Sequence, residues 1–198
     1  SNDKLAEVKK NIEILKPIFL SLLPKEISEF FYNFKVIKHC KYMKSDVIYQ
    51  RYNGFSFCGA YLAKQKNIQF ILEFNSSDVW KIKHWKSNDG KLKKIAKYIY
   101  SKIFKLPVVS FIENYNLKNA TYIVVVSGAL KDTLIGFGVD ETKIIVNPNG
   151  IDETKYHPDI QSDELKVKYK LENKIVFGFI GTFGQWHGAE NIALAYGQ

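Results

Sequence analysis

The 198-residue sequence predicts an α/β fold with a mainly parallel sheet. Short β-rich runs alternate with helical patterns, as expected for successive βαβ units. The clearest strand covers 121–126, a nearly unbroken apolar run that is typical of a parallel strand buried on both faces. A turn-rich crossing at Pro148-Asn149-Gly150 then separates this pattern from a second αβ pattern. Apolar residues make up 46% and charged residues 25%, which fits a globular protein.

The expected elements alternate along the chain. Apolar residues at helical spacing predict helices over 5–19, 27–37, 55–66 and 108–118. Strands are expected at 46–49, 68–74, 121–126, 143–146 and 174–180. A helix of about ten residues should follow Ser127, and another should follow the last strand. No apolar run approaches the ~20 residues that a membrane span requires.

A further helix pattern, 91–105, is strongly basic and contributes to the net charge of +9. Leu92, Ile95, Ile99 and Ile103 recur on one face, and lysines occupy the rest. One interpretation is a helix packed on the core with a solvated basic face. The other is contact with an anionic membrane surface, where each lysine adds about 1 kcal/mol. No nucleic-acid partner is expected, because no aromatic-interleaved binding motif accompanies the charge.

Ligands of open α/β sheets bind beyond the carboxyl ends of the strands. The loop after strand 68–74 carries Asn75 and Asp78, with Trp80 close behind. Polar groups beside an exposed aromatic ring suit a sugar, although Ser, Asn and Asp are also the usual helix caps. Ser127, at the end of the next strand, fits an N-cap better than a nucleophile, because no Gly-x-Ser-x-Gly motif surrounds it.

The segment after strand 174–180 is the strongest candidate for binding a phosphate. A strand, a glycine turn and a helix start present free N–H groups to an anion. The candidate residues are Gly181, Thr182, Phe183 and His187. Their spacing matches neither a dinucleotide-binding fingerprint nor a P-loop. Cys40 and Cys58 have no metal-motif spacing, so free buried thiols and no metal site are expected.

The second half of the sequence resembles a known family. The resemblance covers about residues 113–198 and is carried by several short motifs in close order. They are Ile123-Val124-Val125-Val126-Ser127, Gly138-Val139, Lys143-Ile144-Ile145-Val146, Pro148-Asn149-Gly150-Ile151-Asp152, His157-Pro158, Phe179-Ile180-Gly181-Thr182-Phe183 and Trp186-His187-Gly188. Together they resemble the large family of retaining GT-B glycosyltransferases that includes bacterial capsule, O-antigen and cell-wall enzymes.

The resemblance implies two Rossmann-like lobes. Residues 3–158 would form an incomplete N-terminal lobe that receives the acceptor, 159–173 a linker, and 174–198 the start of the lobe that binds the nucleotide-sugar. Gly181, Thr182, Phe183 and His187 would face the donor diphosphate. Ser127, Asn149 and Gly150 would line the cleft between the lobes. Asn75, Asp78 and Trp80 would lie on the acceptor side.

The implied activity is transfer of a hexose-type sugar from a nucleotide-sugar to a glycan or lipid-linked acceptor in polysaccharide biosynthesis. The cysteine pattern fits a cytoplasmic protein, and the basic segment 91–105 would allow peripheral contact at the inner membrane face. No metal motif occurs, so no metal cofactor is expected. The glycine-rich first loop and the paired glutamates of the family do not occur in this chain, and Asn75 stands where many relatives have histidine. No catalytic residue is therefore assigned, and we expect the chain to be a fragment that is inactive alone.

Two other classes stay open. The first is a non-catalytic Rossmann-like module that binds a sugar or an anion. The second is a sugar-nucleotide epimerase or dehydrogenase, for which Tyr98 and Lys102 have the required spacing but no dinucleotide loop precedes them.

Overall fold

The computed structural model describes Glu13, Leu15, Lys16 and residues 25–85, 98–160, 163–181 and 188–196. The chain divides into two compact units, Ser1–Pro148 and Asn149–Gln198, and each is described by itself. The lobe boundaries implied by the family resemblance stay predictions.

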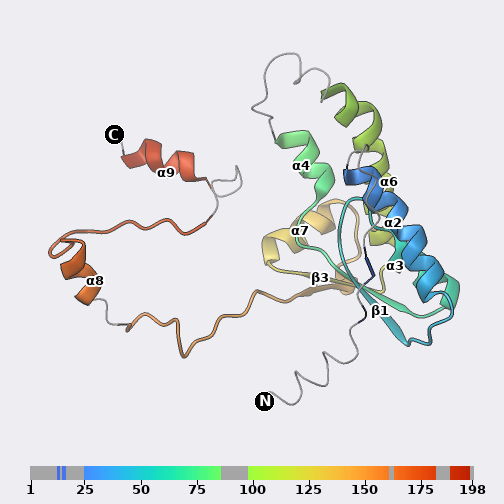
Figure 1. Cartoon of the computed structure of the whole chain (residues 1–198), viewed down its shortest axis with the longest axis horizontal. Coiled ribbons are helices and arrows are strands. Elements are labelled where there is room, and N and C mark those ends of the chain that lie inside the picture. The colour runs from blue at the N-terminus through green and yellow to red at the C-terminus, as the bar shows by residue number, and fades with distance from the viewer. Residues whose placement is uncertain are drawn as a thin grey trace. The chain divides into compact units, whose positions relative to one another are not determined.

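The first unit contains a four-stranded parallel sheet in the order β1-β2-β3-β4. Figure 1 labels β1 and β3 of this sheet and the helices of the unit. The strands are β1 (Val47–Arg51), β2 (Gln69–Glu73), β3 (Tyr122–Val125) and β4 (Ile144–Val146). Among the described residues of this unit, the α-helices are α2 (Lys25–Cys40), α3 (Cys58–Lys66), α4 (Asp78–His84), α6 (Leu106–Asn119) and α7 (Gly128–Gly136), and a 3-10 turn covers Glu141–Lys143. These elements confirm the predicted α/β fold and parallel sheet.

One face of the sheet carries the core. Phe70 and Leu72 of β2 are fully buried, and the register pairs Leu72 with Ile123 of β3. Side chains of α3, α6 and α7, including Ala60, Leu117 and Leu134, belong to the same cluster. Parallel strands taken in sequential order and joined by right-handed crossovers place their connecting helices on one side of the sheet. The single core therefore follows from the strand order.

The opposite face of the sheet is open to solvent. Tyr49 of β1, Tyr122 of β3 and Ile145 of β4 are exposed on it. The prediction that the strand at 121–126 is buried on both faces is therefore wrong for this unit. Its β-branched composition is explained by one buried face, because Ile123 and Val125 pack into the core while Tyr122 does not.

The second unit contains two helices in its described part, α8 (Asp163–Lys168) and α9 (Ala189–Tyr196). Helix α9 confirms the helix expected after Gly181, and α8 lies within the predicted linker. Residues 174–180, predicted as a strand, are not part of one. A strand exists only when it pairs with a neighbour, and the described residues of this unit contain no second strand. The apolar sequence of residues 174–180 was therefore not enough to predict a strand.

The helix predicted over 5–19 falls mostly outside the described residues. Glu13, Leu15 and Lys16 are described and are not helical. The helix predicted over 27–37 is confirmed as α2.

The basic segment 91–105 is described from Tyr98 onward. Residues 98–100 are helical and continue through one π-helical turn, η1 (Ser101–Lys105), into α6. Ile99, Ile103 and Phe104 are exposed. For the described part, the interpretation of this segment as a helix packed on the core is therefore wrong. The membrane alternative stays a prediction.

Side chains from other elements bind the first backbone N–H groups of helix α3. Asn33 of α2 is buried, and its Oδ1 accepts hydrogen bonds from the N–H groups of Phe57 (2.8 Å) and Cys58 (2.9 Å). Its Nδ2 donates to the carbonyl of Phe55 at 2.7 Å. Gln50 of β1 accepts from the N–H of Gly59 at 2.8 Å. These N–H groups have no partner within a helix, so Asn33 connects α2 to the loop before α3.

We predict that Asn33→Ala lowers the free energy of unfolding by about 2–3 kcal/mol, because it leaves buried N–H groups and the Phe55 carbonyl without partners. Urea unfolding followed by circular dichroism measures the change. Lys38→Ala, an exposed change on the same helix, should stay within about 0.5 kcal/mol of the wild type. Equal effects of the two substitutions would contradict this role of Asn33.

Candidate functional site

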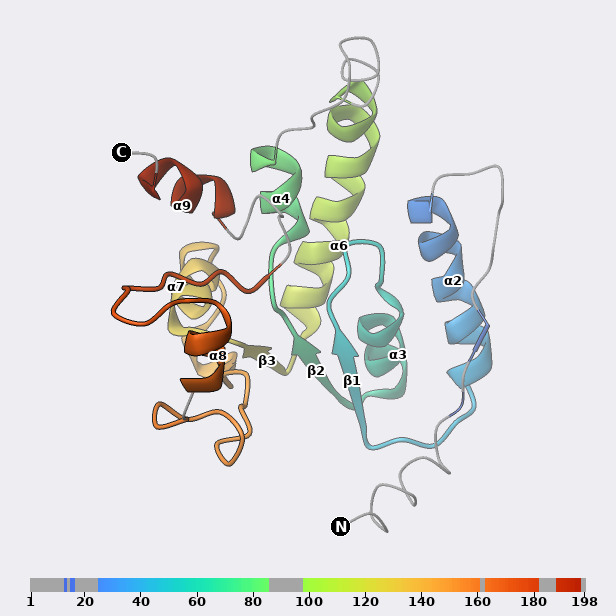
Figure 2. The ribbon, with the colours of Figure 1, turned by 60° about the vertical axis from the view of Figure 1, so that its left-hand side comes forward.

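The loops that follow β1 and β2 meet at the carboxyl edge of the parallel sheet. Residues 52–57 follow β1, and residues 74–77 follow β2 and lead into α4. Figure 2 shows both strands pointing toward the same end of the unit, where α4 and α6 run beside each other. This edge is where ligands bind in open α/β sheets.

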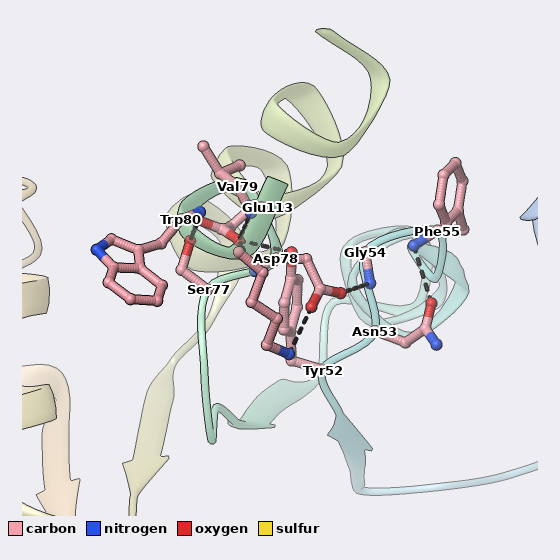
Figure 3. Close-up of polar contacts among 10 residues, drawn as sticks. Tyr52, Asn53, Gly54, Phe55, Ser77, Asp78, Val79, Trp80 and Glu113 are labelled. Atoms are coloured by element: carbon pink, nitrogen blue, oxygen red, sulfur yellow. Dashed lines mark hydrogen bonds and ion pairs between the residues drawn. The ribbon is translucent and has the colours of Figure 1, made fainter. Parts of the chain in front are cut away.

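A buried carboxylate from α6 joins the two loops. Glu113 is 4% exposed, and its oxygens accept hydrogen bonds from the hydroxyls of Tyr52 (2.6 Å) and Ser77 (2.7 Å). They also accept from the backbone N–H of Asp78 at 3.1 Å and, at a longer 3.4 Å, from that of Val79 (Figure 3). A carboxylate is stable away from water only when donors surround it, as they do here.

A second connection links the same two loops. The Oδ2 of Asp78 accepts a hydrogen bond from the backbone N–H of Gly54 at 2.8 Å, and its Oδ1 pairs with Lys81 at 2.7 Å. A Cβ atom at position 54 would lie 2.8 Å from the Asp78 carboxylate and 3.1 Å from Val109. A side chain at position 54 would therefore force the Asp78 carboxylate to shift out of this hydrogen bond, so the glycine is part of the connection.

The side-chain amide of Asn75 has a hydrogen-bonded nitrogen and an oxygen without a partner among the described residues. Its Nδ2 donates to Glu73 at 2.8 Å, and Glu73 also accepts from the Tyr49 hydroxyl at 2.9 Å. These hydrogen bonds, first from Asn75 and then from Tyr49, lower the pKa of Glu73 and keep it ionised. The Asn75 Oδ1 is buried and has no hydrogen-bond partner among the described residues. Asn75 therefore holds an oriented, buried acceptor near the carboxyl edge that no described protein group uses.

The other two acceptor-side candidates differ in their surroundings. Both carboxylate oxygens of Asp78 are engaged within the protein, so its observed role is to hold the loops. Trp80 is 47% exposed, its ring stacks on His84 at 4.5 Å, and it points away from Glu113 (Figure 3). Ser77 is the N-cap of α4, since its Oγ accepts from the N–H of Trp80 at 3.0 Å. Their roles toward a ligand stay predictions.

The remaining predicted site residues lie elsewhere. Ser127 is the N-cap of α7 and accepts from the N–H of Leu130 at 3.3 Å. Asn149 and Gly150 are exposed at the start of the second unit, and Gly181 is exposed within it. Thr182, Phe183 and His187 lie outside the described residues. The predicted cleft and diphosphate site therefore stay predictions.

Sequence reasoning missed Glu113, Tyr52 and Gly54. A signal for Glu113 was present, because it falls at helical spacing among Val109, Ile112 and Leu117, all of which are buried. A charged residue on the apolar face of a helix indicates a buried partner network. Tyr52 and Gly54 carried no such signal.

Within the described residues, no group of three or more His, Cys, Asp or Glu side chains could hold a metal ion. Cys40 and Cys58 are free and half-buried. Across this described part of the chain, no helix is long and apolar enough to cross a membrane.

The Tyr52–Glu113 hydrogen bond makes a pH-dependent prediction. Burial, and then the charge of Glu113, raise the pKa of Tyr52 far above its usual value of about 10. Above pH 10 the unfolded chain loses this proton while the folded protein keeps it, so the free energy of unfolding falls as the pH rises.

We predict that Tyr52→Phe lowers the free energy of unfolding by about 1.5–3 kcal/mol at pH 8, because a hydrogen bond to a charged group is lost. The difference in the free energy of unfolding between wild type and variant should become smaller above pH 10. Urea unfolding at several pH values from 8 to 11 measures this difference. Tyr42→Phe, at an exposed ring, is the control and should change stability by less than about 0.5 kcal/mol. A gap that stays constant up to pH 11 would contradict the raised pKa.

Comparison with known proteins agrees with this architecture. A family model described as glycosyltransferase family 4 matches residues 1–155. The chain is also similar to an uncharacterized glycosyltransferase of Methanocaldococcus jannaschii, with 35% identity over 81 residues. That alignment covers 40% of this chain and 20% of the relative, so the match spans about a fifth of the relative's length. The parallel α/β sheet is consistent with a Rossmann-like lobe of a GT-B glycosyltransferase. With most of its length matched by the family model, the chain belongs to glycosyltransferase family 4.

Proposed function

We propose that the full-length protein moves a hexose-type sugar, with retention, from a nucleotide-sugar to a glycan or lipid-linked acceptor in polysaccharide biosynthesis. In this proposal the first unit forms the acceptor side and the second unit begins the donor side. Family membership supports glycosyl transfer in general. The donor, the acceptor and the retaining mechanism rest on the family resemblance of the sequence. A cytoplasmic location and the absence of a metal cofactor rest on the cysteine pattern and on the lack of a metal motif, and contact with the inner membrane face rests on the basic segment 91–105.

The observation that carries the acceptor-side assignment is the buried Oδ1 of Asn75, which has no hydrogen-bond partner among the described residues. A buried oxygen without a donor costs free energy, and a sugar hydroxyl is a suitable donor. Glu73 holds the amide in place through its bond to Nδ2. The exposed ring of Trp80 would offer an apolar face to the sugar ring.

The negative charge at the carboxyl edge of the sheet disfavours binding of the donor diphosphate there, which supports a diphosphate site in another part of the protein. Glu73, Asp78 and Glu113 place carboxylates around the two loops, while the neighbouring cations Arg51 and Lys81 already pair with Glu73 and Asp78. Carboxylates repel an added diphosphate. In the proposal the diphosphate is therefore bound by Gly181, Thr182, Phe183 and His187, with Ser127, Asn149 and Gly150 at the cleft.

We predict that this 198-residue chain alone turns over no nucleotide-sugar, whereas the full-length protein binds one. A ligand at a hundred times its dissociation constant adds about 2.7 kcal/mol to the stability of the folded state. A thermal-shift screen of nucleotide-sugars against the full-length protein measures this, with the free nucleotides as controls. Binding of a sugar or anion without any transfer to acceptors would favour a non-catalytic binding module instead.

For the full-length enzyme we predict that Asn75→Ala raises the KM for the acceptor about tenfold, as loss of one hydrogen bond of about 1.4 kcal/mol implies. The KM for the donor should stay within about twofold. Asn114→Ala, at an exposed asparagine of α6, is the matched control and should leave both constants unchanged. A rise in the donor KM alone would place Asn75 on the wrong side of the reaction.

A further inference from the structure

The helical run from Tyr98 into α6 is apolar on the side that faces solvent. Ile99 is 50% exposed, Ile103 63%, Phe104 67% and Phe111 71%. The opposite side of α6, with Val109 and Ile112, packs against the rest of the unit. From residue 98 to 111 the exposed side extends about 20 Å at 1.5 Å per residue. We call Ile99, Ile103, Phe104, Val108 and Phe111 the apolar stripe.

The stripe is accompanied by positive charge. The sequence from Gly90 to Ile112 contains no acidic residue, and its lysines are Lys91, Lys93, Lys94, Lys97, Lys102 and Lys105. Lys105 pairs with Glu26 at 2.8 Å. Lys102 is exposed, and its Nζ lies 5.1 Å from the centre of the Tyr98 ring. In the described part, exposed apolar side chains beside Lys102 and Tyr98 match the interface between the headgroups and chains of anionic lipids.

Charge also selects among possible occupants of the stripe. The chain has a net charge of +9, so a second copy docking on this basic surface would be repelled. An anionic bilayer instead attracts each nearby lysine, and it accepts the apolar side chains at the depth of the acyl chains.

We infer that the apolar stripe binds the surface of an anionic lipid bilayer, with Ile103, Phe104 and Phe111 inserted between the lipid headgroups. The stripe, and not charge alone, carries the binding. The inference identifies the residues that contact the bilayer and the depth to which they insert. The basic sequence of 91–105 alone predicted neither.

The position of the apolar stripe also bears on the kind of acceptor. This part of the inference rests on the proposed function. In Figure 2 the helical run begins beyond the carboxyl ends of β1 and β2, and α4, with the exposed Trp80, packs beside α6. Docking through the stripe therefore brings the carboxyl edge, with Asn75, close to the bilayer. An acceptor reached from there is anchored in the membrane, which favours a lipid-linked acceptor over a free glycan.

Vesicle sedimentation of the 198-residue chain tests the inference. The chain should bind vesicles containing phosphatidylglycerol and not vesicles of phosphatidylcholine alone. Phe104→Ser should weaken binding about tenfold, since a tenfold change equals 1.4 kcal/mol and burial of a phenylalanine supplies at least that. Phe137→Ser, at an exposed phenylalanine beside α7, is the matched control and should have no effect.

The charge component is tested in the same assay. Lys102→Gln should weaken binding about fivefold, and Lys64→Gln, on exposed α3 surface, should not. Circular dichroism should show that all four variants keep the wild-type fold.

Three results would overturn the inference. They are no binding to anionic vesicles, binding that salt abolishes but Phe104→Ser does not change, and a dimer in analytical ultracentrifugation that Phe104→Ser dissociates. Vesicle binding needs no turnover, so failure here leaves the nucleotide-sugar screen as an independent test of the proposed function. Failure of that screen likewise leaves the vesicle result unaffected.

Discussion

The carboxyl edge of the sheet depends on one buried carboxylate. Burying a carboxylate costs several kcal/mol unless hydrogen-bond donors replace the lost water. For Glu113 the donors come from Tyr52 after β1 and from Ser77 and Asp78 after β2. Because the charge is satisfied only when both loops close on it, Glu113 couples the position of one loop to the other. The geometry of Asn75 and Trp80 follows from this coupling.

Helix α6 connects this edge to the solvent-facing stripe. Its buried side supplies Glu113 and core residues such as Ile112, while its other side exposes Phe111 and the π-helical turn before it exposes Phe104. A helix with large apolar residues on both sides is unusual for a surface helix, whose outer face is ordinarily polar. One element therefore holds the candidate acceptor site in place and carries the surface that we assign to the bilayer.

The sequence predictions were correct where a feature depends on neighbouring residues and failed where it depends on residues distant in the sequence. The strands at 46–49, 68–74, 121–126 and 143–146 were predictable because β-branched and apolar runs between turns are local signals. The strand at 174–180 was not realised, because pairing needs a partner strand that no local pattern reveals. The hydrogen bonds that satisfy the N-terminus of α3 were also not predictable from the sequence. Its cap residue Phe57 offers no side-chain hydrogen bond, and Asn33, more than twenty residues earlier, supplies the acceptor.

Helix α4 was not predicted, but the sequence by itself determined the fold class, the four strands of the first unit and the loops at their carboxyl ends. These follow from periodicity and from the rule that parallel strands end at a common edge. The tertiary structure decided which polar groups at that edge are used and which are open. In the folded chain the Asp78 carboxylate binds the Gly54 N–H and Lys81, while the Asn75 oxygen has no hydrogen-bond partner among the described residues. Ile103 and Phe104 are exposed to solvent. Burial and hydrogen bonding depend on residues that are distant in the chain, and composition and spacing do not encode those distances.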